Sequence, residues 1–166
     1  GGQFFQWVYP KEENLVSAHR NYLVNYLNRF RSALDSSDFR DPDDGYLSFI
    51  DRASWIDSHI VHQLAKEPDG FAASSYLFKD RQGKIVLGPL WDFDRTMGSD
   101  FDLRSADPVG WHQHMFSHPW WNRLFQDPDF WVAWRDRWYE LRQGPLSFAG
   151  MSALIDEMAV ELGEAY

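Results

Sequence analysis

The chain has 166 residues, of which 44% are hydrophobic and 17% are aromatic, and this composition is that of a folded domain with a substantial core. Its formal net charge of −9 disfavours nonspecific binding to nucleic acid or to an anionic membrane. Cysteine is absent, so disulfides and thiolate metal sites are excluded, and no apolar run reaches the roughly 18 residues that suggest a membrane-spanning helix.

Apolar spacing predicts two helices in the first part of the chain. Residues 4–9 form an aromatic run that we expect to be a strand or an extended lead-in. A helix is predicted over residues 14–34, with Asn14 capping its start. After a polar stretch at 35–45, a second helix is predicted over residues 51–66, with a buried face made of Trp55, Ile56, His59, Ile60 and Leu64.

A β-hairpin is predicted next, followed by a long loop. Pro68-Asp69-Gly70 ends the second helix in a turn. Residues 71–79 and 84–91 have the composition of two strands, and the turn at 80–83 joins them. Residues 92–118 are polar and irregular, and a connection of that length is typical of a functional loop.

The last third of the chain is predicted to be helical. Helices are expected over residues 119–125, 129–142 and 146–164. The final helix is amphipathic, and its predicted buried side chains are Met151, Leu154, Ile155, Met158 and Leu162. No linker divides the chain, so residues 1–166 are predicted to form a single α+β unit that is mainly α-helical.

The hairpin is expected to gather acidic side chains at its open end. If 80–83 is the turn, the numbers of facing residues sum to 163, which places Asp69 opposite Asp94. In Trp91-Asp92-Phe93-Asp94, the acids are expected to face one side while the aromatic rings anchor the other. Carboxylates this close repel one another unless a proton or a cation lies between them, and oxygen ligands suit Mg²⁺ or Mn²⁺. The alternative is that Asp69 only caps its turn and the other two acids face water.

Two other groups of residues offer alternative binding sites. His112, His114 and His118 lie close in sequence and could bind zinc, although packing or surface roles are favoured. Carbohydrate stacking is the alternative to a core role for a group of tryptophans, namely Trp111, Trp120, Trp121, Trp131, Trp134 and Trp138.

The order of these parts is that of a protein kinase site. Kinases place a catalytic Asp, a metal-binding amide or hydroxyl five residues later, a hairpin, and then a metal-binding Asp. Here Asp69 precedes Ser74, the hairpin and Asp92. The stretch HQLAKEPDGFAASSYLFKDRQGKIVLGPLWDFDRTMGS, together with YPKEENL at 9–15, resembles the CotH kinase family, the atypical kinases named after a bacterial spore-coat protein.

That resemblance implies the C-terminal lobe of an atypical protein-kinase-like fold, with its metal-binding acids on the hairpin. It implies transfer of the γ-phosphoryl group of ATP, with Mg²⁺ or Mn²⁺, to a hydroxyl of an acceptor protein. Asp69 would be the catalytic Asp, Asp92 the metal ligand and Asp94 its support. Ser74 and Trp91 would lie on the cofactor side, with Ser74 where many kinases have Asn.

The remaining expectations concern context. Residues 1–68 contain no Gly-rich loop and no suitably placed phosphate-binding lysine. We therefore expect the nucleotide-binding N-terminal lobe to be absent, and residues 1–166 alone to bind ATP poorly and to transfer no phosphate. Residues 99–118 would contact the acceptor, and the resemblance favours a bacterial cell-surface or secreted protein. The alternative is a non-catalytic structural or surface-assembly module that keeps the kinase-like scaffold.

Overall fold

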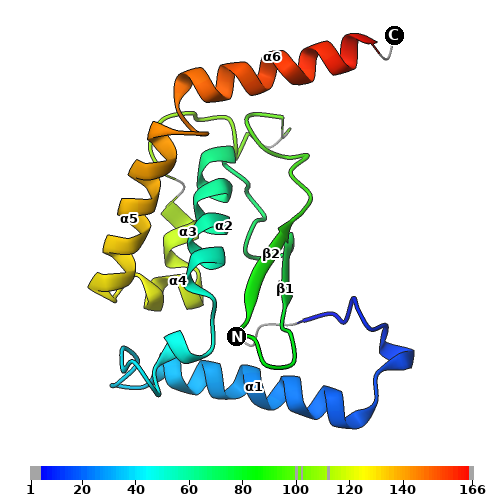
Figure 1. Ribbon diagram of the computed structural model, residues 1–166, viewed down its shortest axis with the longest axis vertical. Coiled ribbons are helices and arrows are strands. Elements are labelled where there is room, and N and C mark those ends of the chain that lie inside the picture. The colour runs from blue at the N-terminus through cyan, green and yellow to red at the C-terminus, as the bar shows by residue number, and fades with distance from the viewer. Residues whose placement is uncertain (1–4, 100, 102, 112, 165–166) are drawn as a thin grey trace. The chain divides into compact units, whose positions relative to one another are not determined.

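The computed structural model describes residues 5–99, 101, 103–111 and 113–164 (Figure 1). The chain is mainly helical and has one small antiparallel sheet, which agrees with the predicted α+β class. It divides into two compact units between Phe49 and Ile50. The prediction of one lobe over residues 1–166 stays a prediction.

The first unit is built on one long helix. A short 3-10 turn, η1 (Glu12–Asn14), precedes α1 (Ser17–Asp35), and a second one, η2 (Tyr46–Ser48), follows it. Residues 5–8 form no strand, so they are the extended lead-in. The expected cap at Asn14 was wrong, because Asn14 lies in η1 and the residue that precedes α1 is Val16, which makes no side-chain cap.

Aromatic contacts fix the end of this unit. The hydroxyl of Tyr26 donates to the carbonyl of Phe49 over 3.1 Å, and the ring centroids of these two residues lie 5.4 Å apart. Phe30 is fully buried and lies 6.3 Å from the Phe49 ring. Burial of these rings is what holds the segment after η2 against α1, since the rest of α1 is largely polar.

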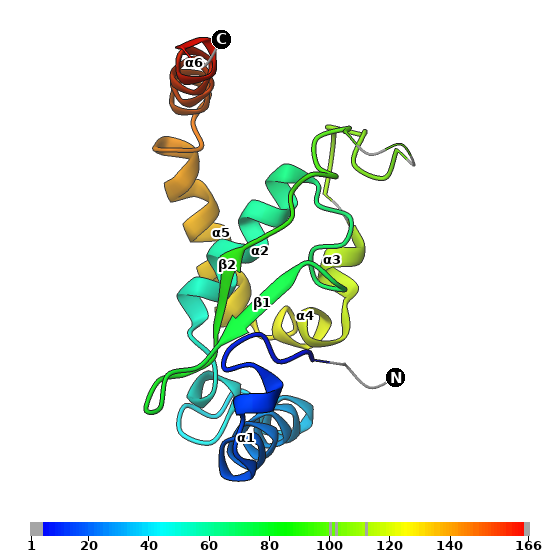
Figure 2. The ribbon, with the colours of Figure 1, turned by 90° about the vertical axis from the view of Figure 1, so that its right-hand side faces the viewer.

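The second unit surrounds the helix α2 (Arg52–Ala65). Figures 1 and 2 show α2 between the hairpin, β1 (Ser75–Phe78) and β2 (Val86–Leu90), and the helix α5 (Pro128–Gln143). The Asp51 side chain caps α2 by accepting from the Ser54 N–H over 2.8 Å. This helix is buried on most of its surface, which explains its high apolar content. The prediction of a helix over 51–66 is confirmed.

The core of this unit is a cluster of rings around His59. Five aromatic centroids lie between 4.6 and 5.8 Å from its imidazole, those of Phe71, Phe116, Trp121, Phe125 and Trp134. Nδ1 of His59 accepts from the indole N–H of Trp134 over 3.1 Å, so Nε2 carries the proton and donates to the Met115 carbonyl. Burial lowers the pKa of His59 to about 3, so the ring is neutral. The core role expected for the tryptophans holds for Trp121 and Trp134, whereas it was wrong for Trp111 and Trp131, which are exposed.

The hairpin differs from its predicted register. Phe78 pairs with Val86 and Leu77 with Leu87, which is a shift of one residue from the predicted register. An irregularity between Ser75 and Leu77 shifts the register by one further residue, so that Ser75 pairs with Leu90. The first strand starts at Ser75 rather than Phe71, because residues 71–74 continue the turn begun at Asp69.

The C-terminal helices agree with the predicted positions but not with the predicted burial. α3 (Gln113–Ser117) lies inside the predicted loop, followed by α4 (Pro119–Leu124), α5 and α6 (Phe148–Glu164). The expected burial of the α6 apolar face was wrong: Leu154, Ile155, Met158 and Leu162 are exposed, because no described element packs along α6. His112 and the His114 side chain lie outside the described residues, so the zinc hypothesis is untested. Within the described part of the chain, no helix is both long and apolar enough to cross a membrane.

Candidate functional site

The turn after α2 holds the backbone of Asp69. α2 ends at Lys66, which has a left-handed conformation with φ 57°. The carbonyl of Asp69 accepts from three successive N–H groups, those of Ala72, Ala73 and Ser74, over 3.0 to 3.2 Å. The N–H of Asp69 donates to Glu67 Oε1 over 2.9 Å. Hydrogen bonds therefore fix the backbone on both sides of Asp69, and with it the position of the Cα atom from which the carboxylate side chain extends.

Two arginines hold the carboxylate of Asp69. Arg95 Nη1 lies 2.7 Å from Oδ2, and Arg104 Nη1 lies 3.0 Å from Oδ1. The hydrogen bond from Arg104 is the largest of the causes that lower the pKa of Asp69, and the charge of Arg95 acts in the same direction. Asp69 is therefore ionised at neutral pH and is a weaker base than an ordinary carboxylate.

The second predicted acid lies two residues after the end of β2. Asp92 has a left-handed backbone with φ 65°, so the chain does not continue as a strand there. Ser74 Oγ lies 3.5 Å from Asp92 Oδ2, a long hydrogen bond at the limit of contact. The hairpin thus brings together Ser74 and Asp92, two of the residues that were predicted to share the site. Asp94 is exposed, and its backbone carbonyl accepts from the Ser99 hydroxyl over 2.6 Å.

The aromatic residues of this segment do not both anchor it. The ring of Phe93 lies 5.0 Å from that of buried His62, as expected for an anchor. Trp91 is 55% exposed and meets Tyr76 edge-on at 5.7 Å, so the expectation that Trp91 anchors the segment was wrong. The strand alternation that suggested it stops at Leu90, because the backbone of Asp92 leaves the extended region.

The buried ring of His62 packs against the turn that contains Asp69. Its Nδ1 donates to the Ser58 carbonyl over 2.7 Å, and its ring lies 4.8 Å from that of Phe71. A Cβ placed on Gly70 would come within 2.3 Å of the His62 ring, so only glycine fits there without a shift. Burial lowers the pKa of His62 below its ordinary value of 6.5, so this ring is neutral at pH 7.

Glu67 is a residue of this site that the sequence argument missed. Its side chain is almost completely buried, with 1% exposed, and Oε2 has no hydrogen-bond partner among the described residues. Burial raises its pKa most, and the negative charges of Asp69, Asp94 and Asp92 raise it further. The available signal was an acidic residue directly after an apolar helix and two residues before Asp69.

The donors present suit a hard divalent cation. Carboxylate oxygens of Asp92 and Asp94 and the hydroxyl of Ser74 are the oxygen ligands that Mg²⁺ and Mn²⁺ prefer, and Glu67 would add negative charge beside them when it is ionised. Among the side chains described, no group of three or more His, Cys, Asp or Glu residues is arranged to hold a metal ion. Mg²⁺ in phosphoryl-transfer sites is bound by one or two carboxylates together with phosphates and water, and these residues fit that mode.

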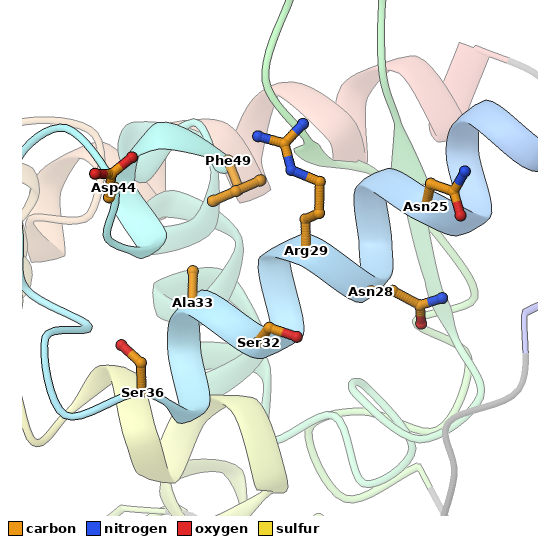
Figure 3. A pocket seen from close by; sticks show the side chains of 8 residues that line it. All are labelled: Asn25, Asn28, Arg29, Ser32, Ala33, Ser36, Asp44 and Phe49. Carbon is orange, nitrogen blue, oxygen red and sulfur yellow. The ribbon is translucent and has the colours of Figure 1, made fainter.

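A shallow hollow lies in the first unit. It measures about 690 Å³ and runs along α1, where Figure 3 shows Arg29 beside Phe49. The Arg29 guanidinium lies 5.5 Å from the centre of the Phe49 ring. The hollow contains none of the residues predicted to carry chemistry.

Comparison with known proteins identifies a family that the chain matches. The family model described as CotH kinase protein matches residues 3–166, which is nearly the whole chain. No curated protein and no solved structure matches at a significant level.

Proposed function

The chain belongs to the CotH kinase family, and we propose that its hairpin site takes part in transfer of a phosphoryl group from Mg-ATP to a protein hydroxyl. The observation that carries this proposal is the contact between Ser74 and Asp92 at the hairpin end that also bears Asp69. It corresponds to the pairing of two metal-binding positions beside a catalytic Asp in kinases. We infer that the helical unit from residue 50 onward is the counterpart of a kinase C-terminal lobe.

Asp69 is assigned to the acceptor hydroxyl. Because two arginines hold its pKa below the ordinary value, it stays a carboxylate and accepts the hydroxyl proton as a hydrogen bond. It therefore orients the nucleophile more than it removes the proton. Asp69 is 28% exposed, so an acceptor can approach it, and the hydroxyl would replace Arg95 or Arg104 at one carboxylate oxygen.

Asp92 is assigned to the cation, with Asp94 supporting it and the Ser74 hydroxyl orienting the Asp92 carboxylate. When bound, Mg²⁺ neutralises charge on the phosphates during transfer. Trp91 offers an exposed ring beside these acids, which suits contact with the nucleotide.

A non-catalytic module is the second candidate. Both carboxylate oxygens of Asp69 are already bonded to arginines, and Ser74 is a weaker metal ligand than Asn or Asp would be. In that case, the ion pairs would serve only to stabilise the turn.

Substitution of the two acids decides between these functions. In the protein that carries this chain, Asp69→Asn and Asp92→Asn are each expected to lower transfer of radiolabelled γ-phosphate about 100-fold or more. The matched control is Asp80→Asn, the same change in the exposed turn at the opposite end of the hairpin, and it is expected to keep the full rate.

Circular dichroism and urea unfolding show whether each variant is folded. Full activity in folded Asp69→Asn or Asp92→Asn would refute the role given to that residue. A wild-type protein that neither binds Mg-ATP in calorimetry nor transfers phosphate would favour the non-catalytic module.

A further inference from the structure

Glu67 carries the strongest observation that the proposed roles leave unused. Its carboxylate is 99% removed from solvent, yet only one of its two oxygens is bonded: Oε1 accepts from the Asp69 N–H over 2.9 Å. Oε2 has no partner among the described residues. A buried carboxylate usually has a cation or several hydrogen-bond donors around it, because leaving either oxygen bare in a low dielectric is costly.

The surroundings make that bare oxygen more unusual. The acids that act electrostatically on Glu67 are Asp69, Asp94 and Asp92, the same three that the hairpin was expected to gather. Arg95 and Arg104 bond to the carboxylate of Asp69 rather than to Glu67. Glu67 therefore adds a fourth negative group to a place where negative charge is already concentrated. Only a further positive charge at that place would make its ionised form favourable.

We propose that Glu67 is a positioning residue of the cation site, which holds the Asp69 N–H through Oε1 and strengthens binding of a divalent cation by Asp92 and Asp94 through the charge on its buried Oε2. This inference rests on the proposed function, because it assumes that Asp92 binds the cation. No direct bond from Glu67 to the cation is required. Since Oε2 is buried and no donor among the described residues bonds to it, its charge acts on the cation with little screening.

A purely structural role for Glu67 makes the opposite prediction for two variants. Glu67→Gln keeps the length of the side chain and an oxygen that can accept from the Asp69 N–H, but removes the charge. Glu67→Asp keeps the charge but shortens the side chain and weakens that hydrogen bond. If the charge matters, Asp is the better replacement for cation binding; if only the shape and the hydrogen bond matter, Gln is the better one.

The experiment is a titration of residues 1–166 with Mn²⁺. Binding is measured by calorimetry and by the decrease in the electron paramagnetic resonance signal of free Mn²⁺. We expect Glu67→Gln to weaken Mn²⁺ binding about tenfold, the size of effect typical of groups that support metal ligands. Glu67→Asp is expected to bind Mn²⁺ more tightly than Glu67→Gln. The control is Glu157→Gln, the same change at an exposed position on α6, and it is expected to bind Mn²⁺ as the wild type does.

Asp92→Asn separates failure of this inference from failure of the proposed function. If Asp92→Asn loses Mn²⁺ binding while folded Glu67→Gln keeps the wild-type affinity, the role of Glu67 is overturned and the cation site stands. If Glu67→Gln binds more tightly than Glu67→Asp, Glu67 is only a turn residue and the inference is likewise overturned. If both Asp92→Asn and Glu67→Gln bind as the wild type does, or the wild type shows no saturable binding, both proposals fall.

Discussion

Gly70 is the residue at which the site turn meets the core. A Cβ there would lie 2.3 Å from Cδ2 of His62, whose buried ring is packed against Phe71 and Phe93. We expect Gly70→Ala to lower the free energy of unfolding by about 1–3 kcal/mol, the usual cost of overpacking a core. Urea unfolding followed by circular dichroism measures this change.

Gly83, in the turn at the other end of the hairpin, provides the comparison. A Cβ on Gly83 would find its nearest neighbour at 3.4 Å, an ordinary contact. Gly83→Ala is therefore expected to leave stability nearly unchanged. Equal losses in the two variants would contradict the close approach of Gly70 to His62.

His59 makes the stability of the second unit depend on pH. Its pKa is lowered to about 3 by burial, below the ordinary value of 6.5 that it regains on unfolding. The unfolded chain therefore binds the proton first, and the stability that His59 contributes is complete above about pH 6.5 and is lost as the pH falls toward 3. His62, whose pKa is also lowered, acts in the same direction.

We expect the free energy of unfolding in urea to fall between about pH 7 and about pH 5. His59→Gln, which keeps a donor and an acceptor but does not titrate, should show a smaller fall. His19→Gln changes an exposed histidine on α1 and serves as control, with the wild-type pH dependence expected. An unchanged slope in His59→Gln would show that the pH dependence has another origin.

Some residues of the site could not have been found from the sequence. Arg95 and Arg104 lie 26 and 35 residues after Asp69, whose carboxylate they both contact, and nothing in local spacing links either arginine to Asp69. Glu67 looked like one more charge at a helix end until its burial was known. By contrast, Asp69, Ser74 and Asp92 could be grouped in advance, because a short hairpin leaves little freedom for where its two ends meet.

At the scale of elements, α2 is the best-defined helix, and its N-terminus offers a direct test. Asp51 accepts from the Ser54 N–H, so Asp51→Ala is expected to lower the free energy of unfolding by about 1 kcal/mol. Asp51→Asn retains a capping oxygen and should lose much less. Chemical denaturation of both variants gives the comparison, and a loss in Asp51→Asn as large as that in Asp51→Ala would contradict the capping role.

The elements also show which patterns determine structure locally. The helices expected at 51–66 and 129–142 agree closely with α2 and α5, since each has a capping Asp and a clear apolar face. The first hairpin strand begins later than expected. The three N–H groups of residues 72–74 donate to the carbonyl of Asp69, so they are not available for hydrogen bonds within the sheet. The α6 pattern correctly predicted a helix, but an amphipathic pattern cannot show whether another element covers its apolar face.

At the scale of the whole molecule, the family match and the site cover different lengths of chain. The match spans residues 3–166, yet every residue assigned to the site follows Ile50. The first unit contributes a long, mostly polar helix, and its described residues 5–49 contain none of the residues assigned to the site. The proposed chemistry therefore lies in the second unit, in which the turn after α2 and the hairpin carry the acids.

The two arginines on Asp69 also make the site sensitive to dissolved ions. Both arginines follow β2 in the chain, while Asp69 precedes β1. The two ion pairs therefore join the segment before the hairpin to the segment after it and close a loop. All three side chains are partly exposed, and ion pairs of that kind weaken as counterions screen them over distances of about 10 Å at 0.1 M salt. A rise in ionic strength would thus loosen the closed loop and, under the proposed function, free the Asp69 carboxylate for an acceptor hydroxyl.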